Sequence, residues 1–320
     1  MLRRRSALAL SAAAAALPRA ARAEWPDRPL RFVVAFPPGA STDVLMRAVA
    51  GRLTEALGRS CLVENRPGAG GNLAAALVAA AAPDGHTLLV HSTAFAVNPS
   101  LYRSVGYDAL RDFTPVAMLA STPNVLFVHP GVAAANLAEL LALMRARPGM
   151  AYGSSGTGTT PHLGAELLFR GLARVEALHV AFGPAQAVTA VVGGQVPVGS
   201  TSLPPALPLL RGGEIRGIAL TGAERHPRLP ELPTAAEQGF PGFEASTWFA
   251  VLAPARTPAA VADRLHAEIA VALALPELRA RLEGMAFTAA PMPRDALAAT
   301  IAAEAAKWAA VVRASGATAE

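Results

Sequence analysis

Short apolar runs alternate along this chain with longer segments in which apolar residues recur every three or four positions. Residues 30–36 form an apolar, β-branched run, which is typical of a buried parallel strand. Pro37 and Pro38 follow it, and neither can donate a ladder hydrogen bond. Apolar residues then recur at helical spacing over 45–57, and Gly58 is a typical helix end. The pattern predicts a strand, a tight turn and a helix.

The same alternation continues to the C-terminus. Further strands are predicted at 61–64, 87–91, 114–119, 124–129, 177–182, 195–198, 215–220 and 243–253. Further helices are predicted at 73–82, 137–147, 161–171, 185–192, from 204, from a Thr257 N-cap to 275, and at 294–313. Strands that alternate with helices predict right-handed βαβ units and an α/β fold.

The predicted strands also suggest a division into two lobes. Two short strands flank residues 121–123, where the chain passes to a second lobe, and the strand at 243–253 returns it to the first. We therefore expect lobe one at 24–122 plus 245–320 and lobe two at 123–244.

The first turn is suited to hold an anion. Ser41, Thr42 and Asp43 are all good N-cap residues. They open a helix at the carboxyl end of a strand, where free N–H groups and the positive end of the helix dipole meet. Asp43 could cap this helix or bind a ligand. Arg66, in the loop after the second strand, could pair with an anion or brace its loop.

A second glycine-rich turn, at 153–161, does not fit three enzyme motifs. It has no Lys for a P-loop, Pro161 stands where a dinucleotide fingerprint needs its third Gly, and Thr157 stands at the last Gly of a nucleophile elbow. With these motifs excluded, the turn offers small hydroxyl residues and exposed N–H groups just before a helix. That composition is typical of carboxylate or phosphate binding without reaction; the alternative is a purely structural loop.

The N-terminus predicts export. Residues 3–5 are Arg, 6–17 form a short Ala/Leu stretch, and Ala21-Arg22-Ala23 precedes Glu24. This is a secretory signal peptide at 1–23 with cleavage after Ala23, and Sec export is favoured over twin-arginine export. The leader therefore predicts an exported protein.

Composition and charge exclude several classes of function. The chain is 52% hydrophobic and 16% charged, so it can bury a large core. Residues 1–23 hold five Arg and no acid, so their removal leaves 23 basic and 23 acidic residues. The basic pI of the precursor is therefore no argument for binding nucleic acid or a membrane surface. No later apolar run of about 20 residues lacks charge or Pro, and we expect no membrane span in the mature chain.

Neither cysteine nor histidine predicts a metal or redox site. Cys61 is the only cysteine and falls in a predicted strand, so we expect a buried, small apolar residue. The seven His residues show no metal-ligand spacing; His162, in the first turn of the helix after the second glycine-rich turn, is the one that could bear on a site. We expect no metal and no cofactor.

Three runs of residues carry a family resemblance. They are 36–43 (FPPGASTD), 64–72 (ENRPGAGGN) and 82–88 (APDGHTL). In this order they resemble the signature runs of the periplasmic solute-binding receptors of tripartite tricarboxylate transporters, also called Bug receptors. The resemblance implies a two-lobed periplasmic binding protein fold of the type II-like, Venus flytrap kind, each lobe a mixed sheet flanked by helices. It also implies a receptor, not an enzyme, that passes a small organic carboxylate to membrane permease subunits.

The resemblance also implies a ligand shell. Carried over by position, the ligand-binding residues are Phe36, Gly39, Ala40, Ser41, Asp43, Ser92, Thr93, Ser154, Ser155, Thr157, Gly158, Thr159, Phe182 and Thr201. The chain departs from the family pattern at Ala40, at 182–184 and at 199–202. The last two changes remove a cation and a carboxylate, so the identity of the ligand stays open.

Two rival functions use the same fold. An exported enzyme would need a nucleophile–base pair or a metal cluster, and the sequence shows neither. A sensor subunit that presents its ligand to a signalling protein is not separable from a transport receptor by sequence.

Overall fold

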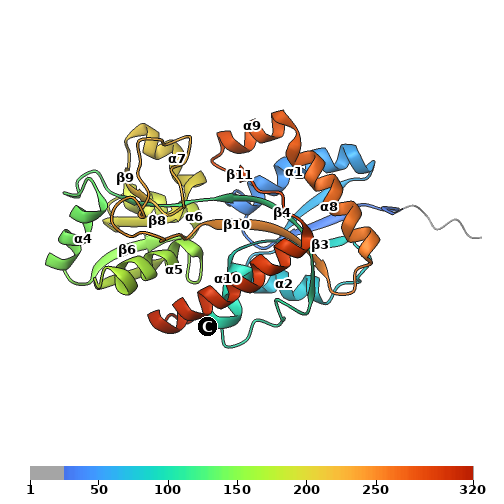
Figure 1. The fold of residues 1–320 in the computed structure, drawn as a ribbon, viewed down its shortest axis with the longest axis horizontal. Helices are drawn as coiled ribbons and strands as arrows, with labels where there is room; N and C mark the ends of the chain where they lie inside the picture. Colours follow the sequence, from blue (N-terminus) through green and yellow to red (C-terminus); the bar gives the residue numbers. More distant parts are fainter. Residues whose placement is uncertain (1–24, 320) are drawn as a thin grey trace, which may run out of the picture.

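The computed structural model describes residues 25–319. The predicted signal peptide and its cleavage site lie outside this range. Two lobes lie side by side, and the long strands β4 (Phe113–Thr122) and β10 (Thr247–Pro254) run toward the second lobe (Figure 1). The predicted two-lobed α/β fold is therefore confirmed.

The first lobe is built on a six-stranded sheet of order β11-β4-β10-β3-β1-β2. Its other strands are β1 (Leu30–Val34), β2 (Cys61–Asn65), β3 (Thr87–Ser92) and β11 (Thr288–Ala289). Strand β1 pairs in parallel with β2 and β3, whereas β10 is antiparallel to β3 and β4. Its helices are α1 (Ser41–Leu57), α2 (Asn72–Ala79), α3 (Ala94–Leu101), α8 (Ala259–Ala274), α9 (Pro276–Gly284) and α10 (Arg294–Ser315), with a 3₁₀ turn at Ala69–Gly71.

The second lobe is built on a five-stranded sheet of order β7-β6-β8-β5-β9. The strands are β5 (Asn124–Val128), β6 (Met150–Ser154), β7 (Ala177–Ala181), β8 (Val198–Ser202) and β9 (Arg216–Leu220). Strand β6 is parallel to β7 and β8, and β5 is antiparallel to β8 and β9. The helices are α4 (Leu137–Ala146), α5 (Thr160–Glu166), which continues as a π-helix over Leu167–Leu172, α6 (Pro184–Val192) and α7 (Leu203–Gly212). Both sheets are mixed, as predicted.

Helix α1 packs as its spacing predicts. Leu45, Val49 and Leu53 are fully buried and share a core with Phe32 and Val34 of β1. Burial of each such aliphatic side chain stabilises the folded state by about 1.5–3 kcal/mol relative to leaving it in water. This packing fixes the helix N-terminus at the carboxyl end of β1.

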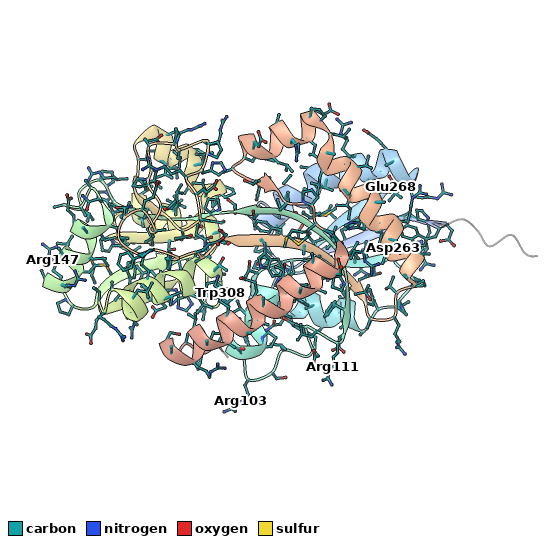
Figure 2. All side chains as sticks on the ribbon, in the orientation of Figure 1. Arg103, Arg111, Arg147, Asp263, Glu268 and Trp308 are labelled. Carbon is teal, nitrogen blue, oxygen red and sulfur yellow. The ribbon has the colours of Figure 1, made fainter. Side chains whose placement is uncertain are left out.

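Helix α10 joins the two lobes. Leu297 and Ile301, near its start, pack in the core of the first sheet, whereas Trp308 and Val312 pack with Phe169 of the second lobe. Figure 2 shows Trp308 on the part of α10 that lies beside the second lobe. The terminal helix thus packs in the cores of both lobes.

The predicted lobe limits, 24–122 plus 245–320 and 123–244, stay a proposal. In their favour, the two sheets share no strand among the described residues, and Pro123 alone separates β4 from β5.

Several predicted boundaries were wrong. Strand β8 covers 198–202 instead of 195–198, because the polar run after Gly199 finds hydrogen-bond partners inside the fold. The returning strand begins at Thr247, not at 243. Helices α3 and α9 were not predicted.

Two local predictions were also wrong. Thr257 is not the N-cap of α8, because its hydroxyl donates to Pro254 O at 2.8 Å and Pro258 occupies the cap position. Cys61 is only partly buried, because it opens the edge strand β2. No helix in residues 25–319 combines the length and the apolar character that crossing a membrane requires.

Candidate functional site

The first turn places the N-terminus of α1 against the second lobe. Gly39 adopts a φ of +80°, which a residue with a side chain adopts at a cost. The Gly39 N–H donates to Asp43 Oδ2 at 2.9 Å, and the Ala40 N–H donates to Pro37 O at 3.2 Å. These two N–H groups are therefore used inside the turn. The donors left for a ligand are the N–H groups of the first helical positions, Ser41, Thr42 and Asp43.

The Asp43 carboxylate braces this turn. It is 3% exposed and also accepts hydrogen bonds from Arg47 Nε and Asn65 Nδ2, each at 2.9 Å. Burial raises the pKa of the Asp43 carboxyl, but the hydrogen bonds from Arg47, Gly39 and Asn65 outweigh burial and bring the pKa below its usual value. The predicted capping role of Asp43 is wrong, because Ala40 is the N-cap of α1 and Asp43 lies in its first turn. Its contacts brace the turn instead.

Arg66 also has a structural partner. Its Nε pairs with Glu64 Oε1, and Arg31 pairs with the other oxygen of the same carboxylate. Two cavities, described below, lie between the lobes, and Arg66 lines neither of them. These contacts favour a loop brace over an anion clamp.

The second glycine-rich turn is held by side chains beneath it. Ser154 Oγ lies 2.7 Å from His179 Nε2, and the Gly158 N–H donates to His162 Nδ1 at 3.1 Å. Gly158 has a φ of +78°, and a Cβ there would lie 2.1 Å from Leu101 Cδ2 of α3. Gly158 is thus required for the contact between the lobes.

The two imidazoles beneath this turn are uncharged. His162 and His179 stack with their ring centroids 3.8 Å apart. Burial, together with His179, lowers the pKa of His162 to about 3, and burial lowers the pKa of His179 to about 4. A neutral His162 Nδ1 can accept the Gly158 N–H. The pair therefore shapes the turn without adding positive charge.

A small polar cavity, here called the chamber, lies between the lobes. Its volume is about 40 Å³. It is lined by Phe36, Ala40, Ser41, Thr42, Ser92, Ser155, Thr159, Thr160, Pro161, Pro184, Ser202, Thr247 and Phe249. None of these side chains is charged, and most of them carry a hydroxyl group. An anion there would be held by hydroxyl and N–H donors.

Hydroxyl groups connect the lobes around the chamber. Ser41 Oγ of α1 lies 3.2 Å from Ser202 Oγ of β8, and the hydroxyls of Thr160 and Thr247 are hydrogen-bonded. Thr247 also donates to Asn124 Oδ1 at 2.7 Å, at the start of β5. Hydroxyl groups of the chamber walls thus link the two lobes at two separate places, Ser41 with Ser202 and Thr160 with Thr247.

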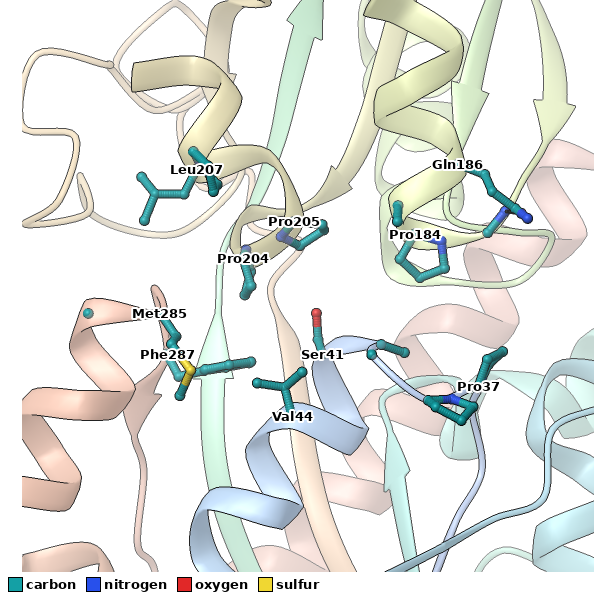
Figure 3. Close-up of a pocket in the computed structure, with 17 residues that line it drawn as sticks. Pro37, Ser41, Val44, Pro184, Gln186, Pro204, Pro205, Leu207, Met285 and Phe287 are labelled. Carbon is teal, nitrogen blue, oxygen red and sulfur yellow. Dashed lines mark hydrogen bonds between the residues drawn. The ribbon is translucent and has the colours of Figure 1, made fainter. Parts of the chain in front are cut away.

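A larger cavity, here called the vestibule, adjoins the chamber at Ala40, Ser41 and Pro184. Its volume is about 520 Å³. Figure 3 shows Val44 of α1 and Phe287 facing Pro204 and Leu207 of α7 across it. The remaining lining residues are Pro37, Pro38, Gly39, Gly183, Ala185, Gln186, Pro205, Pro208, Gly284 and Met285.

The structure brings only part of the predicted ligand shell to the chamber. Six predicted residues line it: Phe36, Ala40, Ser41, Ser92, Ser155 and Thr159. Gly39 lines the vestibule. The roles of all these residues in binding stay predictions.

The other predicted residues line neither the chamber nor the vestibule. Asp43, Ser154 and Gly158 brace the two turns through the contacts given for each. Thr201 Oγ1 lies 2.7 Å from Ser155 Oγ, and Thr93 Oγ1 accepts the Trp248 N–H at 2.9 Å. Phe182 packs against Gly153, and Thr157 lines neither cavity.

Seven lining residues were missed by the sequence prediction: Thr42, Thr160, Pro161, Pro184, Ser202, Thr247 and Phe249. The first five lie within or next to runs that the sequence had singled out. Thr247 and Phe249 lie on β10, where no local signal marks them. Within residues 25–319, no three His, Cys, Asp or Glu side chains are grouped so that they could hold a metal ion.

Comparison with known proteins gives a consistent result. Residues 45–317 match the family model described as tripartite tricarboxylate transporter family receptor, TctC. Protein BugT of Bordetella pertussis is 37% identical over 92% of this chain and 91% of its own length. A UPF0065 protein in the tcbD-tcbE intergenic region of Pseudomonas sp. strain P51 is 38% identical, over 89% of this chain and 85% of its own length.

Solved structures are similar over nearly the whole chain. R. palustris Rpa4515 with adipate has a TM-score of 0.87 and 36% identity, covering 92% of this chain and 99% of that one. MatC from Rhodopseudomonas palustris with bound malate has a TM-score of 0.83 and 32% identity, covering 90% and 99%.

Proposed function

The chain belongs to the tripartite tricarboxylate transporter receptor family, and on that premise we propose that it is a periplasmic solute-binding protein for a small organic carboxylate. In this role it holds the carboxylate between its two lobes and delivers it to the permease subunits of a tripartite tricarboxylate transporter. It performs no chemistry on its ligand.

The chamber is the observation that carries this proposal. It lies between the lobes, its walls supply hydroxyl groups from both, and the first turn of α1 forms one side. Hydroxyls, N–H groups and a helix N-terminus together favour a carboxylate. The solved relatives with adipate and malate are consistent with this class of ligand.

Binding between two lobes also explains how the ligand would be signalled to a transporter. A carboxylate that accepts hydrogen bonds from Ser41 on one lobe and Ser202 on the other stabilises the arrangement in which the lobes meet. The permease then recognises the two lobes together. A dissociation constant near 1 μM requires about −8 kcal/mol, and several hydrogen bonds to a charged group, at about 1.5–3 kcal/mol each, can supply it.

Isothermal titration calorimetry with a panel of mono-, di- and tricarboxylates, and with amines and neutral sugars for comparison, tests the proposal. We expect micromolar or tighter binding of at least one carboxylate, with no turnover of that compound by mass spectrometry. Binding of amines or neutral sugars with no carboxylate bound would overturn the ligand class, and steady product formation would overturn the receptor.

A further inference from the structure

The vestibule has an apolar surface that the two lobes build together. Val44 and Phe287 come from the first lobe, and Leu207 with three prolines of α7 comes from the second. None of its lining residues is charged. The side chain of Gln186 is the longest polar one, and its Oε1 already accepts the Gly183 N–H at 2.9 Å.

The two cavities differ in size as well as in polarity. The chamber, at about 40 Å³, has room for little more than one or two water-sized groups. A carboxylate group fits this space, and the rest of a larger ligand does not. The vestibule, at about 520 Å³, is within the usual range of small-molecule pockets and begins where the chamber ends, at Ala40, Ser41 and Pro184.

We propose that the ligand is a monocarboxylate with an apolar tail, whose carboxylate lies in the chamber and whose tail lies in the vestibule. The inference rests on the proposed carboxylate-binding function and names the ligand class for that same site. An apolar tail gains from leaving water for the surface that Val44, Met285 and the prolines of α7 expose there. A second carboxylate at the far end of the tail would meet no cation among the lining residues and would gain nothing from the apolar wall.

Compounds of equal chain length test the inference by calorimetry on the mature protein. Hexanoate and adipate differ only in the second carboxylate, and benzoate and terephthalate form a matched aromatic pair. We expect the monocarboxylate of at least one pair to bind at least tenfold tighter than its dicarboxylate partner. Each added buried methylene group should strengthen binding about three- to fourfold, so hexanoate should bind at least tenfold tighter than propionate.

The outcomes separate the two proposals. If none of these acids or the wider carboxylate panel binds, the proposed function fails. If adipate and terephthalate bind as tightly as their monocarboxylate partners, or if affinity does not rise from propionate to hexanoate, the carboxylate function stands and the inference fails. The vestibule then serves another occupant, such as a permease segment.

Two variants test the location of the tail. Met285 is partly exposed on the vestibule wall and packs against the edge of the first lobe's core, so Met285→Lys places a cation there and removes only part of that packing. We expect this variant to lose at least fivefold in affinity for hexanoate and to gain at least fivefold for adipate. Met150→Lys changes a partly exposed Met of β6 that lines neither cavity and should leave both affinities unchanged. Equal effects of the two substitutions, or no effect of Met285→Lys, would contradict the inference.

Discussion

Ser41 and Ser202 meet hydroxyl to hydroxyl between the two lobes, with 3.2 Å between their Oγ atoms. Ser41 opens helix α1 and Ser202 closes strand β8, so each is held by regular secondary structure. Both line the chamber. A ligand carboxylate oxygen that lies beside both hydroxyls can accept a hydrogen bond from each lobe.

The first prediction concerns this pair. Ser202→Ala should weaken binding of a carboxylate ligand by about 1.5–3 kcal/mol, because one hydrogen bond to a charged group is lost. Calorimetric titration measures this loss. Ser60→Ala removes the hydroxyl of an exposed Ser outside both cavities and serves as the control. Equal affinities of the two variants would show that the Ser202 hydroxyl does not contact the ligand.

The second prediction concerns the backbone of the first turn. Gly39→Ala should lower the free energy of unfolding by about 1–2 kcal/mol, because Gly39 has a φ of +80°. A Cβ at Gly39 meets no atom within 4 Å, so the cost arises from the backbone conformation and not from a clash. We also expect weaker ligand binding, because relief of the strain moves the N-terminus of α1. Denaturant unfolding and calorimetry measure the two effects.

Gly58 offers a matched control at the other end of the same helix. It also has a positive φ, +62°, and a Cβ there would meet no atom within 4 Å. Gly58→Ala should therefore cost a similar free energy of unfolding and leave ligand affinity unchanged. If both variants bind ligand equally well, the first turn does not contribute to binding.

The third prediction separates two charged residues near the first turn. Asp43→Ala should lower the free energy of unfolding by about 2–3 kcal/mol and weaken ligand binding, because it leaves the Gly39 N–H without its acceptor and removes one of the two acceptors of Asn65 Nδ2. Arg66→Ala removes an exposed pair with Glu64 and should change stability by less than about 1 kcal/mol. We expect it to leave affinity unchanged. Loss of binding in Arg66→Ala alone would identify Arg66 as an anion clamp.

The fourth prediction concerns pH. The pKa of His162 is lowered from 6.5 to about 3 and that of His179 to about 4. Between pH 6.5 and about 4 the unfolded chain therefore binds protons that the folded chain does not, so stability falls as pH falls. At pH 5 the loss is about 2 kcal/mol for each ring relative to pH 7. Thermal or urea unfolding across this range measures it.

The variant His162→Asn should reduce this pH dependence. An Asn side chain can still accept the Gly158 N–H but does not titrate in this range. His129→Asn is the control, because His129 lies after β5 and its Nδ1 accepts the Gly131 N–H in the same way. The prediction is wrong if His129→Asn flattens the stability profile as much as His162→Asn does.

The sequence by itself determined the local elements and the family. The spacing of Leu45, Val49 and Leu53 predicted helix α1, and the hydroxyl residues before them predicted a turn with free donors, because capping and amphipathic packing depend on neighbours in sequence. The three family runs predicted the two-lobed fold. The bounds of strand β8 were predicted wrongly because its Ser and Thr residues do not show the apolar pattern of a buried strand.

Only the tertiary structure decided which residues face the space between the lobes. Thr247 and Phe249 line the chamber because alternate residues of β10 share one face, and the pairing of β10 with β3 and β4 decides which face that is. Asp43 and Ser154 resemble ligand residues in sequence, yet the Gly39 N–H and His179 already engage them. A hydroxyl or carboxylate binds whichever partner the fold brings within about 3 Å, and the local sequence does not contain that information.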